Sequence, residues 1–189
     1  TWIQDDNQIK YFYYDKLGRV TREERKLRLS RMQPGEQDIT YITHFKYDLL
    51  NRKIEITYPE DAKTNTRLTV YKAFSGPNIT KITTNNGTDT KQVIENITYN
   101  EFGQMATIKR GNNTETNYTY DIKGRLTSLV TYSNNNNVLK KLQDVTYTFK
   151  VDNSIASVIN KPDQDTDGAF NSTIEYNYQY DGLNRLIHA

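Results

Sequence analysis

Tyr120-Asp121-Ile122-Lys123-Gly124-Arg125-Leu126 is the stretch of this sequence that decides its fold. Tyr118 and Tyr120 alternate in front of it, which is the period of a strand with one buried face. Asp121 can hydrogen-bond the backbone two residues on, and Gly124 can adopt a positive φ. The stretch therefore predicts a β-hairpin tip, formed by a type I turn that a left-handed residue closes with a bulge.

The same pattern recurs in four other places along the chain. It reads tyrosine, Asp or Asn, two variable residues, Gly or Asn, and then usually arginine; the other copies are 13–20, 46–53, 98–105 and 179–186. Only glycine and asparagine fill the position that needs a positive φ. We predict that these residues are equivalent corners, each reversing the chain: Gly18, Asn51, Gly103, Gly124 and Asn184.

The spacing of the copies indicates additional, weaker ones. Successive motif tyrosines lie 33, 52, 21 and 60 residues apart, so halving the two long intervals gives units of 26 and 30 residues. Degenerate copies at Tyr71–Gly76 and Phe149–Asn153 fall about where they are missing. We expect residues 1–189 to form one repeat segment of about six or seven hairpins, itself part of a longer protein.

The composition favours a thin sheet over a thick core. Hydrophobic residues make up 35% of the 189 residues, and fifteen tyrosines supply large rings whose hydroxyls need water or a partner. A single hairpin is marginally stable in water, so the hairpins must stack edge to edge. We predict an all-β fold of stacked antiparallel hairpins in a spiralling sheet.

Charge and apolar content exclude several kinds of partner. The formal net charge is only +2, which gives no strong field for nucleic acid. No apolar run is long enough to span a bilayer in this segment. With no cysteine, the chain can hold neither disulfides nor a thiolate metal site.

The repeated residues resemble the YD repeats of the RHS-repeat family, which includes bacterial RHS toxins, the B and C components of insecticidal toxin complexes and, more distantly, animal teneurins. The best copies are Tyr14-Asp15-x-x-Gly18-Arg19, Tyr120-Asp121-x-x-Gly124-Arg125 and Tyr180-Asp181-x-x-Asn184-Arg185. The resemblance covers essentially the whole chain. It implies a β-strip wound into a cocoon that encloses a toxic C-terminal domain. The family's Asp-Pro-x-Gly cleavage motif is absent from this sequence.

Side chains with catalytic potential are few and scattered. His44 and His188 lie 144 residues apart, with no typical spacing to a metal ligand or a nucleophile. The turn aspartates could pair as carboxylates, but their recurrence at the first turn position favours backbone capping. We therefore assign no catalytic or cofactor-binding residue and expect the segment not to be an enzyme.

Two groups of basic residues have alternative interpretations. The motif arginines could bind an anionic ligand, but we favour pairing with turn carboxylates, across strands or between repeats, together with stacking on tyrosines. The charged stretch 21–31 could be a basic helix that contacts nucleic acid. Its glutamates, and its place directly after a turn, favour a solvated strand.

One acidic loop matches half of a calcium site. Asp163, Asp165 and Asp167, followed by Gly168, reproduce the first half of a calcium-binding loop. The twelfth position is Ile174 instead of glutamate, and the flanks indicate strands. An ordinary solvated acidic loop is the default interpretation, and calcium binding is the alternative.

These observations lead to one functional expectation with two alternatives. We expect a non-catalytic segment of a cocoon that encapsulates a toxic C-terminal domain and helps to deliver it, in a secreted or surface-exposed bacterial virulence protein. Its partners would be the enclosed domain and the remaining shell repeats or toxin-complex subunits. A cell-surface adhesion module that binds carbohydrate or protein is the main alternative, and exposed aromatics at Tyr11–Tyr14 would favour it. A hydrolase would need carboxylates clustered in a pocket.

Overall fold

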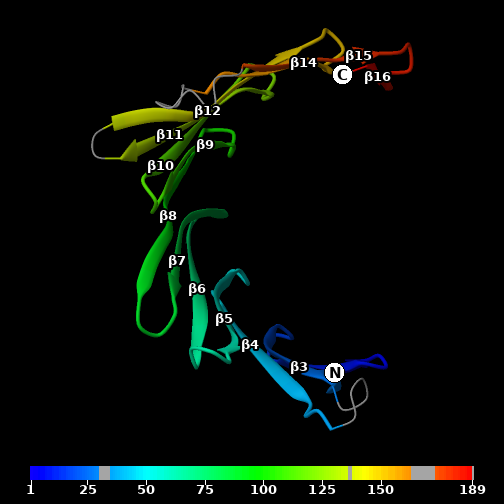
Figure 1. The fold of residues 1–189 in the computed structure, drawn as a ribbon, viewed down its shortest axis with the longest axis vertical. Coiled ribbons are helices and arrows are strands. Elements are labelled where there is room, and N and C mark those ends of the chain that lie inside the picture. Colours follow the sequence, from blue (N-terminus) through cyan, green and yellow to red (C-terminus); the bar gives the residue numbers. More distant parts are fainter. Residues whose placement is uncertain (30–34, 136–137, 163–172, 189) are drawn as a thin grey trace. The chain divides into compact units, whose positions relative to one another are not determined.

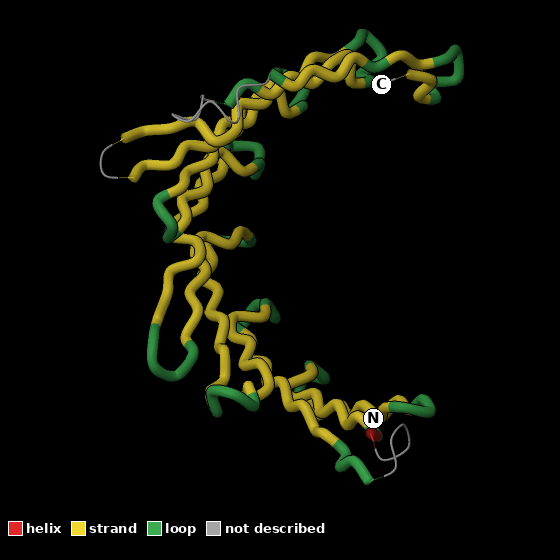
Figure 2. The backbone as a smooth tube through the Cα atoms, viewed as in Figure 1, coloured by secondary structure: helices red, strands yellow, loops and turns green. Residues whose placement is uncertain are grey.

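The structure, a computed structural model, describes residues 1–29, 35–135, 138–162 and 173–188. It divides into two compact units, Thr1–Val93 and Ile94–Ala189, and each is considered by itself. Nearly all regular structure in these ranges is β-strand, and the strands alternate with turns along the whole trace (Figures 1 and 2). None of the helical structure in the described ranges is long and apolar enough to cross a membrane.

The first unit is a sheet of consecutive antiparallel strands. Each strand pairs with the next one along the chain, from β1 through β7. The strands are β1 (Trp2–Gln4), β2 (Gln8–Tyr14), β3 (Val20–Leu27), β4 (Ile39–Tyr47), β5 (Lys53–Asp61), β6 (Thr66–Ser75) and β7 (Asn78–Asn85). The charged stretch after the first corner forms β3 as far as Leu27. In that part the predicted strand is confirmed, and the alternative interpretation as a basic helix is wrong.

The second unit repeats this arrangement. Strand β8 (Thr90–Tyr99) begins before the unit boundary, and from β8 to β14 each strand is again antiparallel to its successor. The other strands are β9 (Met105–Arg110), β10 (Thr114–Tyr120), β11 (Leu126–Asn135), β12 (Val138–Phe149), β13 (Ile155–Asn160) and β14 (Ile174–Asn177). A separate two-stranded sheet pairs β15 (Gln179–Tyr180) with β16 (Leu186–His188).

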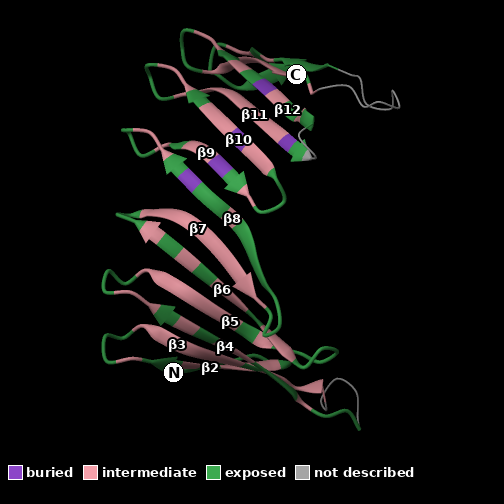
Figure 3. Ribbon diagram, turned by 90° about the vertical axis from the view of Figure 1, so that its left-hand side faces the viewer, coloured by how far each residue is buried: buried purple, intermediate pink, exposed green. Residues whose placement is uncertain are grey.

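The core of the second unit is a row of side chains on one face of this sheet. Ile97 pairs directly with Ile108, and Ile108 with Thr116, so the three side chains share a face. Ile97, Ile108 and Thr116 are buried, as is Val145 two strands further on (Figure 3). The Thr116 hydroxyl hydrogen-bonds that of Thr131 at 2.9 Å, which satisfies a polar group in this row.

The sheet keeps far more surface exposed than a compact protein of its mass. Its accessible area is 13268 Å². A folded monomer of 22.1 kDa has about 9,300 Å² by the usual scaling of area with mass. The excess is typical of a single layer, since only five of the described residues are buried: Ile97, Ile108, Thr116, Ser133 and Val145. The predicted all-β class of stacked antiparallel hairpins is confirmed.

Candidate functional site: the row of corner turns

The corner at Gly124 has the backbone geometry that its sequence predicts. The Gly124 N–H donates to the Asp121 carbonyl at 2.9 Å, and the Asp121 N–H donates to the Arg125 carbonyl at 3.0 Å. Gly124 has φ 77, in the left-handed region, and the strand register shifts between Thr119 and Tyr120. These are the features of a type I turn closed by a left-handed residue and a bulge.

The same corner forms at every complete copy of the motif. All five predicted residues have positive φ, and each donates its N–H to the carbonyl three residues back. The values of φ are 76 at Gly18, 60 at Asn51, 76 at Gly103, 77 at Gly124 and 57 at Asn184. The prediction of equivalent corners is therefore confirmed. Within the main sheet of each unit these turns lie at one edge, formed by the strand ends, and the β5–β6 and β9–β10 loops lie at the other (Figure 3). The Asn184 corner belongs to the separate β15–β16 sheet.

The two weaker copies form hairpins of two kinds. Asn153 has φ 71 and closes the same turn as the complete copies, between Lys150 and Ser154. Gly76 has φ 53, but Ser75 pairs directly with Asn78, which leaves a two-residue loop. The β6–β7 corner is thus shorter, and it lacks the aspartate of the complete motif.

Each motif aspartate binds its own turn with both carboxylate oxygens. In the copy at Asp121, Oδ1 accepts hydrogen bonds from the backbone N–H groups of Lys123 and Arg125, both at 2.9 Å. Oδ2 accepts one from Nε of Arg125 at 2.7 Å. Asp15, Asp48 and Asp181 make the same three bonds. Backbone capping, the predicted role of these residues, is confirmed.

The capping bonds favour the ionised form of these carboxyls. The pKa of Asp121 lies below its ordinary value, chiefly because the Arg125 backbone N–H binds it, while burial opposes the shift. The pKa of Asp15 and that of Asp181 are lowered mainly by the equivalent bonds, from the backbone N–H of Arg19 and that of Arg185. At Asp48 burial acts to raise the pKa, but the hydrogen bonds from Arg52 and Leu50 outweigh it. The hydrogen bonds that lower these pKa values make each carboxylate a weaker base than a free one.

One copy replaces this ion pair by a neutral pair with the same geometry. Asn100 accepts hydrogen bonds from the backbone of Phe102 and Gln104, both at 3.0 Å. Its amide donates to the Gln104 side chain, also at 3.0 Å. The two departures from the motif therefore compensate each other, which sequence comparison within the chain did not reveal.

The residue after each of four corners also binds the following corner. Arg125 donates to Oδ1 of Asn153 at 2.9 Å, and Gln104 donates to the Gly124 carbonyl at 2.7 Å. In the first unit, Arg19 donates to Oδ1 of Asn51 at 2.9 Å, and Arg52 donates to the Gly76 carbonyl. Successive corners are thereby joined by side-chain bonds as well as by strand pairing.

Arginine also stacks on the aromatic residue that precedes the next corner. The guanidinium carbon of Arg125 lies 4.4 Å from the centre of the Phe149 ring, and that of Arg19 lies 5.0 Å from the centre of the Tyr47 ring. Both distances are within the range of cation–π attraction. Pairing of the arginines with turn carboxylates is confirmed, but each pair lies within one turn and does not join two repeats. The aromatic partner lies in the next repeat, and it is tyrosine for Arg19 but phenylalanine for Arg52 and Arg125.

Tyrosine hydroxyls hydrogen-bond the backbone of the previous repeat. Tyr47 donates to the Val20 carbonyl at 2.8 Å, and Tyr120 donates to the Met105 carbonyl at 2.9 Å. Each hydroxyl thus finds a partner while its ring packs between repeats. Arginine and tyrosine together make the corner row a series of reciprocal contacts between neighbouring hairpins.

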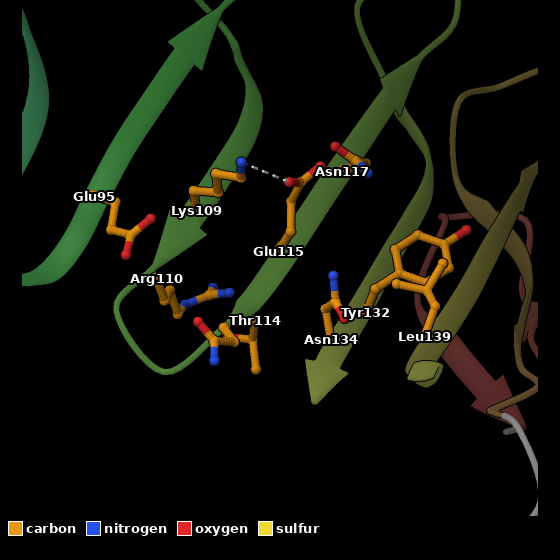
Figure 4. A pocket seen from close by; sticks show the side chains of 10 residues that line it. Glu95, Lys109, Arg110, Thr114, Glu115, Asn117, Tyr132, Asn134 and Leu139 are labelled. Atoms are coloured by element: carbon orange, nitrogen blue, oxygen red, sulfur yellow. Dashed lines mark ion pairs between the residues drawn. The ribbon is translucent and has the colours of Figure 1, made fainter. Parts of the chain in front are cut away.

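A polar concavity of ≈ 440 Å³ lies on the second unit. Three of its four charged side chains are engaged with neighbours. Lys109 lies 4.0 Å from the Glu115 carboxylate (Figure 4), and Arg110 donates to the Thr116 hydroxyl at 2.8 Å. Its lining contains neither a histidine nor a nucleophile paired with a base. The lining residues are Glu95, Lys109, Arg110, Asn113, Thr114, Glu115, Asn117, Tyr132, Asn134 and Leu139.

The remaining sequence candidates do not gather into a site. His44 is exposed on β4 and His188 on β16. Among the described residues, no group of three or more His, Asp and Glu side chains could hold a metal ion. Asp163, Asp165 and Asp167 lie outside the described residues, so the calcium loop stays a prediction.

Comparison with known proteins finds similarity through structure alone. No protein-family model and no curated protein matches the sequence. The fold matches a chain of the TcdB2-TccC3-Cdc42 crystal structure, with 21% identity over 97% of this chain and a TM-score of 0.78. It matches the TcdB2-TccC3 crystal structure equally well, with 21% identity over 96% of this chain. A third match is the Tc holotoxin pore of Photorhabdus luminescens carrying TccC3-D651A, with 21% identity, 97% coverage and a TM-score of 0.79.

These findings define the class by its fold, a sheet of stacked β-hairpin repeats. The matches confirm, at the level of the fold, the resemblance to RHS/YD-repeat proteins. In particular, the chain has the fold of one stretch of the Tc toxin chains, and it spans 9% of the length of each.

Proposed function

We propose that this chain is a non-catalytic wall segment of a cocoon that encapsulates a toxic C-terminal domain and helps to deliver it. The observation that carries the proposal is the corner row, in which arginine and tyrosine bind each hairpin to the next. Such contacts stiffen a one-layer sheet, which has no second layer to support it. The likeness to Tc toxin chains supports the same function.

The proposal includes the absence of catalysis and of a resident cofactor. In each complete charged motif, the carboxylate accepts three hydrogen bonds from its own turn, so the repeated acidic residues serve structure. The active principle would be the enclosed domain. The shell repeats and toxin-complex subunits are the partners, and the protein would be a secreted bacterial virulence factor.

The adhesion alternative is not favoured by the comparisons. Tyr11, Tyr13 and Tyr14 are exposed by 38%, 42% and 47%, which leaves some aromatic surface on β2. However, the Tyr13 hydroxyl donates to Glu24 at 2.6 Å, and Arg22 stacks on its ring. This aromatic surface is partly occupied by the chain's own side chains.

The test measures enclosure in the full polypeptide that contains this segment. Electron cryomicroscopy should find a closed shell with density inside, and limited proteolysis should leave the enclosed domain uncut. Replacing Arg19 and Arg125 by alanine should weaken the wall and expose that domain to protease. Lys63→Ala, on an exposed loop at the opposite edge, is the matched control. An open sheet, or a C-terminal domain cleaved as quickly as the isolated domain, would refute encapsulation.

A further inference from the structure

The tips of the corner turns in the second unit carry a row of exposed apolar side chains. Each lies between the first turn residue and the corner residue of its hairpin. The exposed fractions are 79% for Phe102, 104% for Ile122, 98% for Val151 and 76% for Leu183. By contrast, the loop at the opposite edge between β9 and β10 is Gly111-Asn112-Asn113. Ile122 and Val151 occupy the first of the two variable turn positions, and Phe102 and Leu183 occupy the second. An exposed apolar side chain at the tip of every corner indicates a contact surface.

This tip row is held at a regular spacing. The corners that carry Phe102, Ile122 and Val151 are joined directly, because Arg125 donates to Asn153 at 2.9 Å and Gln104 donates to the Gly124 carbonyl. In the main sheet one corner occurs every two strands, so these three tips are roughly 10 Å apart. The fourth corner belongs to the separate β15–β16 sheet and contacts the third through Lys150, whose Nζ lies 4.6 Å from the centre of the Tyr180 ring. Side chains as exposed as Ile122 and Val151 contribute almost nothing to the stability of their own hairpins. They are therefore free to bury surface against a partner.

We propose that the tip row docks antiparallel on the tip row of a second copy of this chain. Ile122 of each copy then lies against Val151 of the other, and Phe102 lies opposite Leu183. The first argument is the spacing, because a second row presents apolar side chains at the same interval of roughly 10 Å. In a two-fold contact each pair of side chains occurs twice, so each favourable pair contributes twice to the free energy of association.

Charge supports the same partner and the same direction. The carboxylate of Asp121 is neutralised by Arg125, and that of Asp181 by Arg185, so these two carboxylates add no net charge to the row. Lys123 follows Ile122, and Asp152 follows Val151. An antiparallel pairing brings opposite charges together at both central positions, whereas a parallel pairing would bring like charges together.

The size of the contact sets its strength. Four apolar tips per copy, at roughly 100 Å² each, bury about 800 Å² in total. This area is below the size of stable interfaces, which starts at about 1,200 Å². The association is therefore weak in solution, with a dissociation constant of about 10 μM to 1 mM. It does not depend on whether the wall encloses a cargo, so it can fail or hold independently of the proposed function.

The first experiment is sedimentation equilibrium of the 189-residue chain from about 10 μM to about 1 mM. A reversible monomer–dimer equilibrium is expected. Val151→Ser should raise the dissociation constant at least about tenfold, and Ile122→Ser likewise, because each removes two buried apolar contacts per dimer. Val138→Ser is the matched control, since Val138 is also exposed, by 67%, but lies away from the corners. Circular dichroism establishes that each variant is folded.

The second experiment determines the direction of docking by disulfide formation. The natural chain has no cysteine, so introduced thiols report only on the designed positions. A mixture of Ile122→Cys and Val151→Cys chains should form the mixed dimer faster than either variant forms its own dimer. A chain that stays monomeric throughout the concentration range would overturn the proposal. So would a dimer that Val138→Ser weakens as much as Val151→Ser, or a mixture in which Ile122→Cys chains link preferentially to one another.

Discussion

Replacing Gly124 by alanine tests the corner geometry most directly. Gly124 has φ 77, where an L-residue's Cβ approaches its own carbonyl oxygen and costs about 1–2 kcal/mol. An added Cβ would lie 3.4 Å from Nε2 of Gln104, the movable end of a side chain, so the backbone accounts for most of the expected strain. Gly124→Ala should therefore destabilise the β10–β11 hairpin by about 1–2 kcal/mol.

Amide hydrogen exchange is the appropriate assay, because stacked repeats need not unfold in one step. A loss of about 1–2 kcal/mol reduces exchange protection roughly five- to thirtyfold in β10 and β11. Gly124→Asn should cost less, because asparagine adopts this conformation more readily, as Asn51 and Asn184 do in the equivalent corners. Gly182→Ala is the control, since an added Cβ there meets no atom within 4 Å and its φ is ordinary.

Two results would refute this reasoning. One is a loss of protection for Gly124→Ala no larger than that for Gly182→Ala. The other is an equal loss for asparagine and alanine at position 124, which would mean that the left-handed backbone does not limit the corner.

Other predictions follow from the same corners. Arg125→Gln alone should destabilise its hairpin. Adding Asp121→Asn should recover part of that stability, because the two new side chains can form the neutral pair seen between Asn100 and Gln104. Urea denaturation of the single and double variants measures the recovery. Tyr47→Phe should lower the free energy of unfolding by about 0.5–1.5 kcal/mol through loss of the bond to the Val20 carbonyl, and unchanged urea stability would contradict this. The pKa of Asp15 and that of Asp121 are lower in the folded chain than in the unfolded chain. The stability that these carboxylates contribute is therefore complete above the unfolded pKa near 3.8, and it is lost as the pH falls through the folded pKa. NMR should find the corners intact at about pH 5, and melting of the corners near pH 6 would contradict the assignment.

The sequence predicted the backbone turn of each corner, but it did not predict all of the side-chain pairs that the corners form. The turn is short, and its conformation depends on local chemistry, so Asp121 and Gly124 were enough to predict it. The repeat of this motif also predicted the all-β fold, since each hairpin needs a neighbour to bury its tyrosines. The neutral Asn100–Gln104 pair was missed because its geometry becomes visible only when both side chains are placed.

The sequence by itself determined where the chain turns, because each turn is made by residues that are close neighbours along the chain. Only the tertiary structure decided which corners touch, because the Arg19–Asn51 and Arg125–Asn153 bonds join residues 32 and 28 positions apart. Those contacts depend on strand register and on the length of the intervening hairpins, neither of which the motif specifies. The same register places Ile122 and Val151 at neighbouring tips and so creates a surface that no single repeat contains.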